Sequence, residues 1–199
     1  MGTRVFDGGR SSLKTLVFFL EEPSAKEMLD CLLPKILNQD TSYRCIVFQG
    51  KQDLEKSLPK RLRGWQHPDS VFIIIRDQDS GDCRTIKQNL VSLCQQAGKA
   101  NALVRIACHE LESFYLGDLK AVEKGLGING IASAQEKRKF RAPDMLPHPA
   151  DELNKLTKGC YEKVAGSRAI APHLDLSRNK SESFNILLQG IRRLIERDP

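Results

Sequence analysis

The sequence predicts an α/β fold with a small parallel sheet of about four strands flanked by helices. Short apolar runs rich in aromatic and β-branched residues alternate with stretches whose apolar residues recur at helical spacing. The runs are almost wholly apolar, which is typical of strands buried on both faces. Strands and helices that alternate in this way form parallel sheets with crossover helices.

The first half of the chain supplies the sheet. We expect a helix after each of four strands, and Ser24 with Glu27 fits a capping box at the start of the first helix. Asp82 can cap the helix that begins near Cys83. The expected strands span residues 14–20, 43–48, 71–75 and 102–107, and the helices 24–37, 54–63, 83–97 and a segment carrying Leu111, Phe114, Tyr115 and Leu116.

The periodic signal weakens after residue 126. Residues 127–150 contain three prolines and no expected strand. Helices are predicted over about 150–156 and 181–195. We therefore expect an α/β core over residues 1–126 and a helical, loop-rich C-terminal extension over 127–199, packed on the same domain.

Composition excludes several classes of protein. With 199 residues, 40% of them hydrophobic, the chain can build one packed core. No apolar run approaches the ~20 residues that cross a bilayer, and the first ten residues lack the apolar stretch of a secretory leader. Six widely spaced cysteines without a CxxC pair exclude a zinc ribbon. We expect a soluble, cytoplasmic protein with no membrane partner.

Familiar catalytic motifs are missing from the sequence. It has neither a G-x-x-x-x-G-K-[ST] phosphate loop nor a G-x-S-x-G elbow, and its four histidines lie far apart. Its net charge of +6 is concentrated in residues 134–199, which hold 13 basic and 9 acidic residues. This bias permits a polyanionic partner, and an ordinary solvated surface is the alternative.

Acidic residues follow three of the four expected strands. The carboxyl ends of parallel strands meet at one edge of a sheet, where ligands of open α/β sheets bind. Close carboxylates repel one another by ~1 kcal/mol or more per pair, so a cation should lie among them, and hard oxygen ligands favour Mg²⁺ or Mn²⁺. The alternative is that each acid caps a helix. The acids are Glu21 and Glu22, Asp77 and Asp79, and Glu110 and Glu112.

Glu110 and Glu112 cannot both face the site. Residues two apart on a helix lie on different faces, so only one should point inward. We favour Glu110, because Leu111, Phe114 and Tyr115 define the buried side next to it.

Several segments carry a resemblance to known families. A glutamate after the first strand and an Asp-x-Asp after a later one resemble the Toprim domain of topoisomerases, primases and OLD-type nucleases, a small Rossmann-like sheet. The fuller pattern resembles a bacterial family called domain of unknown function 4276. Its segments are F-L-E-E-P-S at 19–24, I-R-D-Q-D-S-G-D-C at 75–83, C-H-E-L-E-S-F-Y-L-G-D-L at 108–119, K-F-R-A-P-D at 139–144, and Y-E-K-V-A-G-S-R at 161–168, with a later S-E-S-F.

The resemblance implies roles for the acids. Asp77 and Asp79 would be metal ligands for Mg²⁺ or Mn²⁺, and Glu21 the catalytic glutamate. Such families usually have Glu-Gly in the first motif, whereas Glu22 follows Glu21 here, which leaves open which glutamate faces the metal. Glu22, Glu110 and Glu112 are therefore further candidate ligands.

The resemblance also implies an activity. We expect a metal-dependent phosphodiester hydrolase that acts on DNA or RNA, with an ATPase encoded nearby as a partner, in phage defence. The alternative is a non-catalytic interaction subunit that keeps the fold and the acids. The residues expected to bind nucleic-acid phosphates are Lys137, Arg138, Lys139, Arg141, Lys163 and Arg168.

Overall fold

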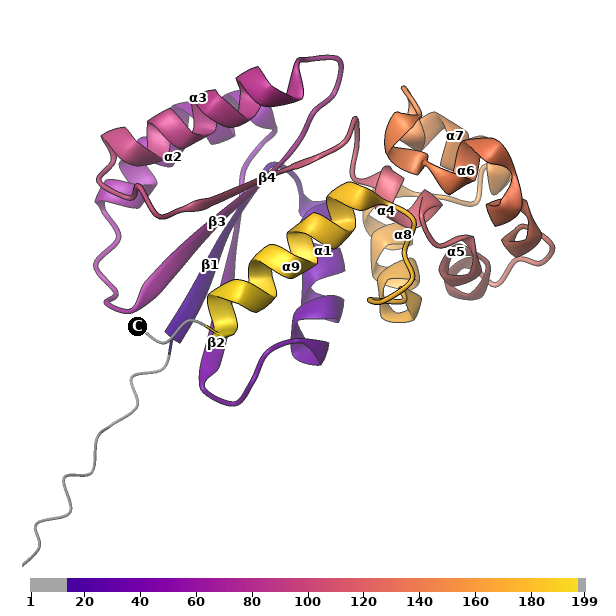
Figure 1. Cartoon of the computed structure of the whole chain (residues 1–199), viewed down its shortest axis with the longest axis horizontal. Coiled ribbons are helices and arrows are strands. Elements are labelled where there is room, and N and C mark those ends of the chain that lie inside the picture. Colours follow the sequence, from indigo (N-terminus) through magenta and orange to yellow (C-terminus); the bar gives the residue numbers. More distant parts are fainter. Residues whose placement is uncertain (1–13, 197–199) are drawn as a thin grey trace, which may run out of the picture.

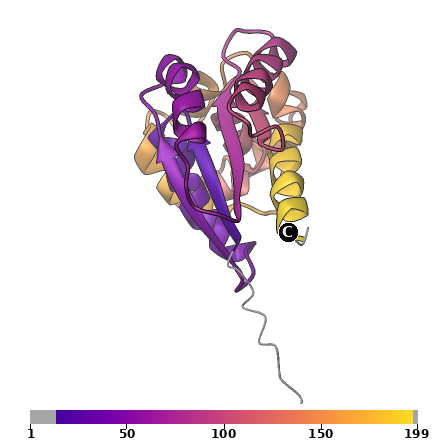
Figure 2. The same cartoon turned by 90° about the vertical axis from the view of Figure 1, so that its left-hand side faces the viewer.

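A computed structural model describes residues 14–196 and shows a four-stranded sheet with helices on both faces (Figures 1 and 2). The strands are β1 (Lys14–Leu20), β2 (Thr41–Val47), β3 (Ser70–Asp77) and β4 (Leu103–Ala107). Their order in the sheet is β2-β1-β3-β4, and all three pairs are parallel. The predicted α/β class and the four-stranded parallel sheet are thus confirmed.

The ends of the chain bear on two expectations. The first ten residues, on which the expectation about a leader depends, lie outside the described residues, as do the last three residues of the C-terminal extension. Between residues 14 and 196, no helix combines the length and the hydrophobicity needed to cross a bilayer.

Strand β3 is longer than the sequence predicts. The expected strand stopped at Ile75, where the apolar run ends, but pairing with β4 continues through Arg76 to Asp77, which lies opposite Ala107. A charged residue can end a sheet strand because the carboxyl edge opens toward solvent or a ligand. The added residues bring Asp77 into the sheet itself.

Two helices cover one face of the sheet, α2 (Lys51–Arg63) and α3 (Cys83–Gln96) (Figure 1). Leucines along α2 recur every four residues, so they form one stripe and pack on the sheet. The predicted cap of α3 is confirmed, since the Asp82 carboxylate accepts the backbone N–H of Thr85 at 2.8 Å.

The opposite face is covered by α1 (Pro23–Leu32) and α9 (Glu182–Glu196). Helix α1 begins one residue earlier than predicted, and the expected capping box is wrong. The Ser24 hydroxyl donates to the Glu22 carboxylate at 2.6 Å, while the Glu27 carboxylate accepts a hydrogen bond from Arg168. Helix α1 ends at Leu32, and a 3₁₀ turn over Leu33–Lys35 follows it.

The remaining helices lie beyond β4. Helix α8 was not predicted from the sequence, because its residues are mostly small or polar and show only a weak apolar stripe. Buried side chains of this region, including Phe140, Leu153 and Ile170, belong to the same apolar cluster as β1 and α1. The elements are α4 (Glu112–Leu116), α5 (Leu119–Leu126), α6 (Arg138–Arg141), α7 (Pro149–Leu156) and α8 (Lys163–Ile170), with 3₁₀ turns at Ala132–Glu136, Pro143–Met145 and Ala171–His173.

Candidate functional site

The order of the strands reverses at the carboxyl ends of β1 and β3. From β1 the chain passes to β2 on one side and then crosses to β3 on the other side of β1. In open α/β sheets, such a reversal of strand order is where ligands bind. Glu21 follows β1 and Asp77 ends β3 at this point, and the Asp77 N–H donates to Glu21 Oε2 at 3.1 Å.

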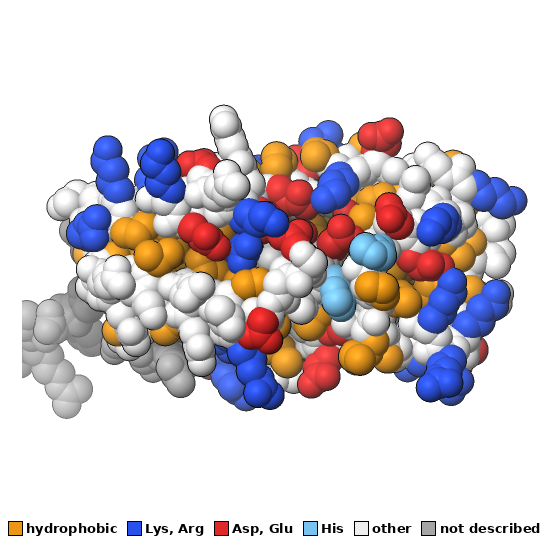
Figure 3. Space-filling model, turned by 90° about the horizontal axis from the view of Figure 1, so that it is seen from above, with side chains coloured by type: hydrophobic (Ala, Val, Ile, Leu, Met, Phe, Trp, Pro, Cys, Tyr) orange, Lys and Arg blue, Asp and Glu red, His pale blue; other side chains and the backbone are white. Residues whose placement is uncertain are grey.

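Figure 3 views the molecule from above, over this edge of the sheet. Acidic side chains gather near the middle of the view, with basic side chains and histidines among them. On this face, acidic and basic side chains are thus interspersed near the middle.

Asp77 and Glu112 form the buried part of the site, with exposed fractions of 8% and 0%. The pKa of Asp77 lies well above its ordinary value, because of burial first and then the charges of Glu22, Glu112 and Glu21. A hydrogen bond from the backbone of Leu111 opposes this shift. Asp77 therefore lies within electrostatic reach of these three glutamates.

The two carboxylate oxygens of Glu112 have different surroundings. Oε1 accepts the hydroxyl of Tyr161 at 2.9 Å, whereas Oε2 is buried and has no hydrogen-bond partner. Burial raises the pKa of Glu112, although Lys163 and the Tyr161 hydroxyl act in the opposite direction. A buried carboxylate oxygen without a hydrogen-bond partner is unfavourable, and this atom is available to accept one.

A lysine supplies positive charge to this buried cluster. Lys163 Nζ, at the start of α8, lies 3.4 Å from Glu22 Oε2. Burial alone would lower the pKa of Lys163, but the charges of Glu112, Glu22 and Asp77 outweigh it and the pKa is raised. A cation of the chain itself therefore lies beside these acids, although Lys163 was predicted to bind nucleic-acid phosphates.

The other acid of the Asp-x-Asp pair turns toward α2. Asp79 has a left-handed backbone (φ 54°), and its N–H donates to the carbonyl of His109 at 2.6 Å. Its Oδ2 accepts Lys51 Nζ at 2.8 Å. Asp79 still interacts with Glu21 and helps to raise its pKa, after burial as the largest cause. Asp77 and Asp79 therefore lie near the same glutamate, each with different partners.

Arg76 is a second cation at the site. It is 7% exposed, and its guanidinium lies 3.8 Å from Glu21 and 3.6 Å from Glu55. Its Nε has no hydrogen-bond partner. Arg76 therefore connects the acidic site to α2.

Glu110 has a structural role in this structure. Its Oε2 accepts the backbone N–H of Ala150 at 2.8 Å, at the start of α7. The preference for Glu110 as the inward residue is therefore corrected: Glu112 is the buried one. A left-handed backbone at His109 (φ 58°) changes the chain direction just before α4, which helical spacing alone cannot reveal.

The six basic residues expected to bind phosphates lie in separate places. Lys139 is ion-paired with Glu152, and Arg168 binds Glu27 through two bonds of 2.7 and 3.0 Å. Lys163 belongs to the acidic site. Lys137, Arg138 and Arg141 lie at or beside α6, where the chain is exposed.

The fit of the site to a divalent cation is partial. Among residues 14–196, no three His, Cys, Asp or Glu side chains are already grouped as a metal site. The donor chemistry fits Mg²⁺ or Mn²⁺, because hard carboxylate oxygens repel one another and Glu112 Oε2 has no partner. Ligation by Glu22 or Asp79 requires each to leave the lysine that now binds it.

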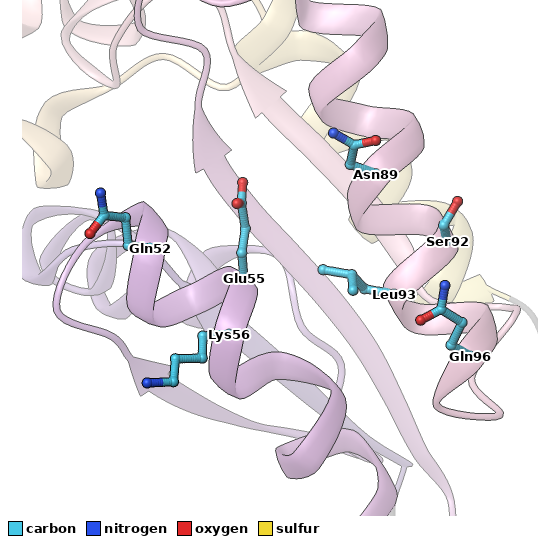
Figure 4. Close-up of a pocket in the computed structure, with 7 residues that line it drawn as sticks. All are labelled: Gln52, Glu55, Lys56, Asn89, Ser92, Leu93 and Gln96. Carbon is cyan, nitrogen blue, oxygen red and sulfur yellow. The ribbon is translucent and has the colours of Figure 1, made fainter.

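A groove of about 580 Å³ separates α2 from α3 (Figure 4). None of the acids predicted for the site lines it. Its Glu55 contacts Arg76, so the groove adjoins the acidic site on the α2 side. The lining residues are Gln52, Glu55, Lys56, Asn89, Ser92, Leu93 and Gln96.

Comparison with known proteins agrees with this architecture. The family model described as Domain of unknown function (DUF4276) matches residues 20–192. The fold is similar to the C-terminal region of the Burkholderia pseudomallei OLD protein, with a TM-score of 0.50 and 16% identity over 90% of this chain and 98% of that one. No curated protein matches the chain.

Proposed function

Since the chain belongs to the family described as Domain of unknown function (DUF4276) and has a Toprim-like fold, we propose that it is a metal-dependent phosphodiester hydrolase of nucleic acid. One observation carries the proposal. Asp77 and Glu112 are buried carboxylates at the reversal point of the sheet, and one oxygen of Glu112 has no partner. Such a group is unfavourable in its charged form, and binding of a cation would stabilise it.

Different acidic residues would bind the metal and transfer the proton during hydrolysis. Asp77 and Glu112 would hold Mg²⁺ or Mn²⁺, with Asp79 and Glu22 as further ligands. A bound ion of this kind neutralises phosphate charge and lowers the pKa of water. Glu21 has a pKa raised chiefly by burial, so it can exchange a proton nearer to neutral pH than an exposed glutamate can.

A cleavage assay tests this proposal. Purified protein is incubated with single-stranded and duplex DNA and RNA in Mg²⁺ or Mn²⁺. We expect Asp77→Asn and Asp79→Asn each to abolish cleavage, because each removes a charged ligand. Asp82→Asn is the matched control: it lies in the same segment but caps α3, so cleavage should persist.

Two results would count against the proposal. Cleavage that survives in Asp77→Asn would indicate a contaminating nuclease. Metal binding without cleavage under every combination would favour a non-catalytic protein. The assay is repeated with any ATPase encoded nearby, because the resemblance to Toprim-like nucleases implies such a partner and a role in phage defence.

The substrate-binding part of the proposal places phosphates on the basic segment around α6. Lys139→Ala with Arg141→Ala should weaken binding and reduce the slope of log K against log salt by about one for each phosphate that the variant no longer neutralises. Since Glu152 already pairs with Lys139, we expect Arg141 to contribute more. Arg168→Ala should change binding least, because Glu27 holds that guanidinium. An equal effect of all three would argue against this assignment.

A non-catalytic interaction subunit is the second candidate, and the lysines favour it. Lys51 binds Asp79 and Lys163 lies beside Glu22, so two of the proposed ligands are neutralised within the chain. The hydrolase requires the metal, whereas the interaction subunit does not. At a concentration 100 times its Kd, Mn²⁺ would stabilise the fold by ~2.7 kcal/mol. A melting temperature that Mn²⁺ leaves unchanged would favour the interaction subunit.

A further inference from the structure

We propose that Tyr161 is a positioning residue that presents Glu112 to the divalent cation. Its hydroxyl binds one oxygen of Glu112 and leaves the other free for the ion. This inference rests on the proposed function. It adds that the segment between α7 and α8, about fifty residues after Glu112 in the chain, completes the site.

The hydrogen bond fixes the direction of the carboxylate. Tyr161 donates to Glu112 Oε1 at 2.9 Å in an environment where Glu112 is fully buried and Tyr161 is 7% exposed. The phenolic O–H is the donor in this bond, and the carboxylate oxygen accepts. With Oε1 engaged, Oε2 is the atom that remains to accept a ligand.

The tyrosine ring is itself held in place. A Cβ atom on Gly166 would lie 2.5 Å from two ring carbons of Tyr161, so the glycine lets α8 pack directly on the ring. The ring also packs against Tyr115, with centroids 6.2 Å apart. The hydroxyl of Tyr161 is therefore aimed at Glu112 by packing on both sides, as expected for the partner of a metal ligand.

Two phenylalanine substitutions form a matched test. Tyr161→Phe removes the hydroxyl bound to Glu112 and keeps the ring. Tyr115→Phe removes another buried hydroxyl, which donates to Ser167 at 2.7 Å instead of to a carboxylate. Mn²⁺ binding is measured by the paramagnetic resonance signal of free Mn²⁺, and thermal unfolding checks that both variants are folded.

We expect Tyr161→Phe to weaken Mn²⁺ binding about 10–100-fold, the usual cost of losing the partner of a metal ligand. Tyr115→Phe should leave the affinity close to that of the wild type. In a Glu112→Gln background, Tyr161→Phe should cause no further loss, because the ligand it positions is already gone. This second comparison also separates positioning from a general loss of packing.

The outcomes separate this inference from the proposed function. Wild-type affinity in Tyr161→Phe, or equal losses in the two tyrosine variants, would overturn the positioning role and leave the metal site standing. A full additional loss in the Glu112→Gln background would also overturn it. A wild-type protein that binds no Mn²⁺ would overturn both.

Discussion

Ionisation of Asp77 should make the metal-free protein less stable as the pH rises. Its folded pKa is raised well above 3.8, by burial first and then by Glu22, Glu112 and Glu21. Such an acid holds more protons in the folded than in the unfolded state. Its contribution to the free energy of unfolding therefore falls as the pH rises from 3.8 through the folded pKa.

The size of the effect follows from linkage. One titrating group changes the free energy of unfolding by at most ~1.4 kcal/mol per pH unit. For a protein of this size, 1 kcal/mol corresponds to about 2–4 °C in melting temperature. We therefore expect a fall of up to about 3–6 °C per pH unit. Carboxylates with lowered pKa, such as Asp82 and Asp175, act in the opposite sense, but only below their unfolded value of 3.8.

The assay is thermal unfolding, followed by circular dichroism between about pH 5 and 8 with a chelator present. Asp77→Asn should flatten the decline and melt above the wild type at the alkaline end. Asp175→Asn is the control, because it loses bonds to Ser177 and Arg178 and should melt lower at every pH. A variant Asp77→Asn that melts below the wild type at about pH 8, with an unchanged slope, would refute the reasoning.

Three further predictions concern the surroundings of the site. Glu110→Ala should cost about 1 kcal/mol by uncapping α7, with Mn²⁺ affinity unchanged; a loss of affinity would make Glu110 a ligand after all. Gly166→Ala should lower both the melting temperature and Mn²⁺ affinity, because the added Cβ displaces Tyr161, and unchanged values would contradict this close packing. Lys51→Ala should strengthen Mn²⁺ binding by freeing Asp79, and weaker binding would show that the lysine supports the site.

The sheet could be predicted because its signal is local. Strands buried on both faces are apolar throughout, and the helices between them show a stripe of regular spacing, so each element is recognisable from a dozen neighbouring residues. The cap at Asp82 was also predictable, since it depends on Thr85 three residues away. The sheet edge that carries Glu21 and Asp77 follows from the parallel arrangement.

The partners of the acids could not be predicted, because they depend on distant segments. Tyr161 and Lys163 reach the site from the extension. The choice between Glu110 and Glu112 depends on a left-handed residue, His109, and on the start of α7, which needed an acceptor for its backbone N–H. None of these contacts produces a recognisable spacing of residues in the sequence.

The order in which the two faces of the sheet are covered has a consequence for synthesis on the ribosome. The face beneath α2 and α3 is complete once β4 has emerged, at residue 107. The opposite face is not covered until α9, which carries Phe184, Leu187 and Ile191, has also been synthesised. During that interval the nascent protein exposes an apolar surface, and exposed surfaces of this kind promote aggregation and recruit chaperones. Translation that stops before α9 should therefore yield insoluble fragments, even though every strand has been made.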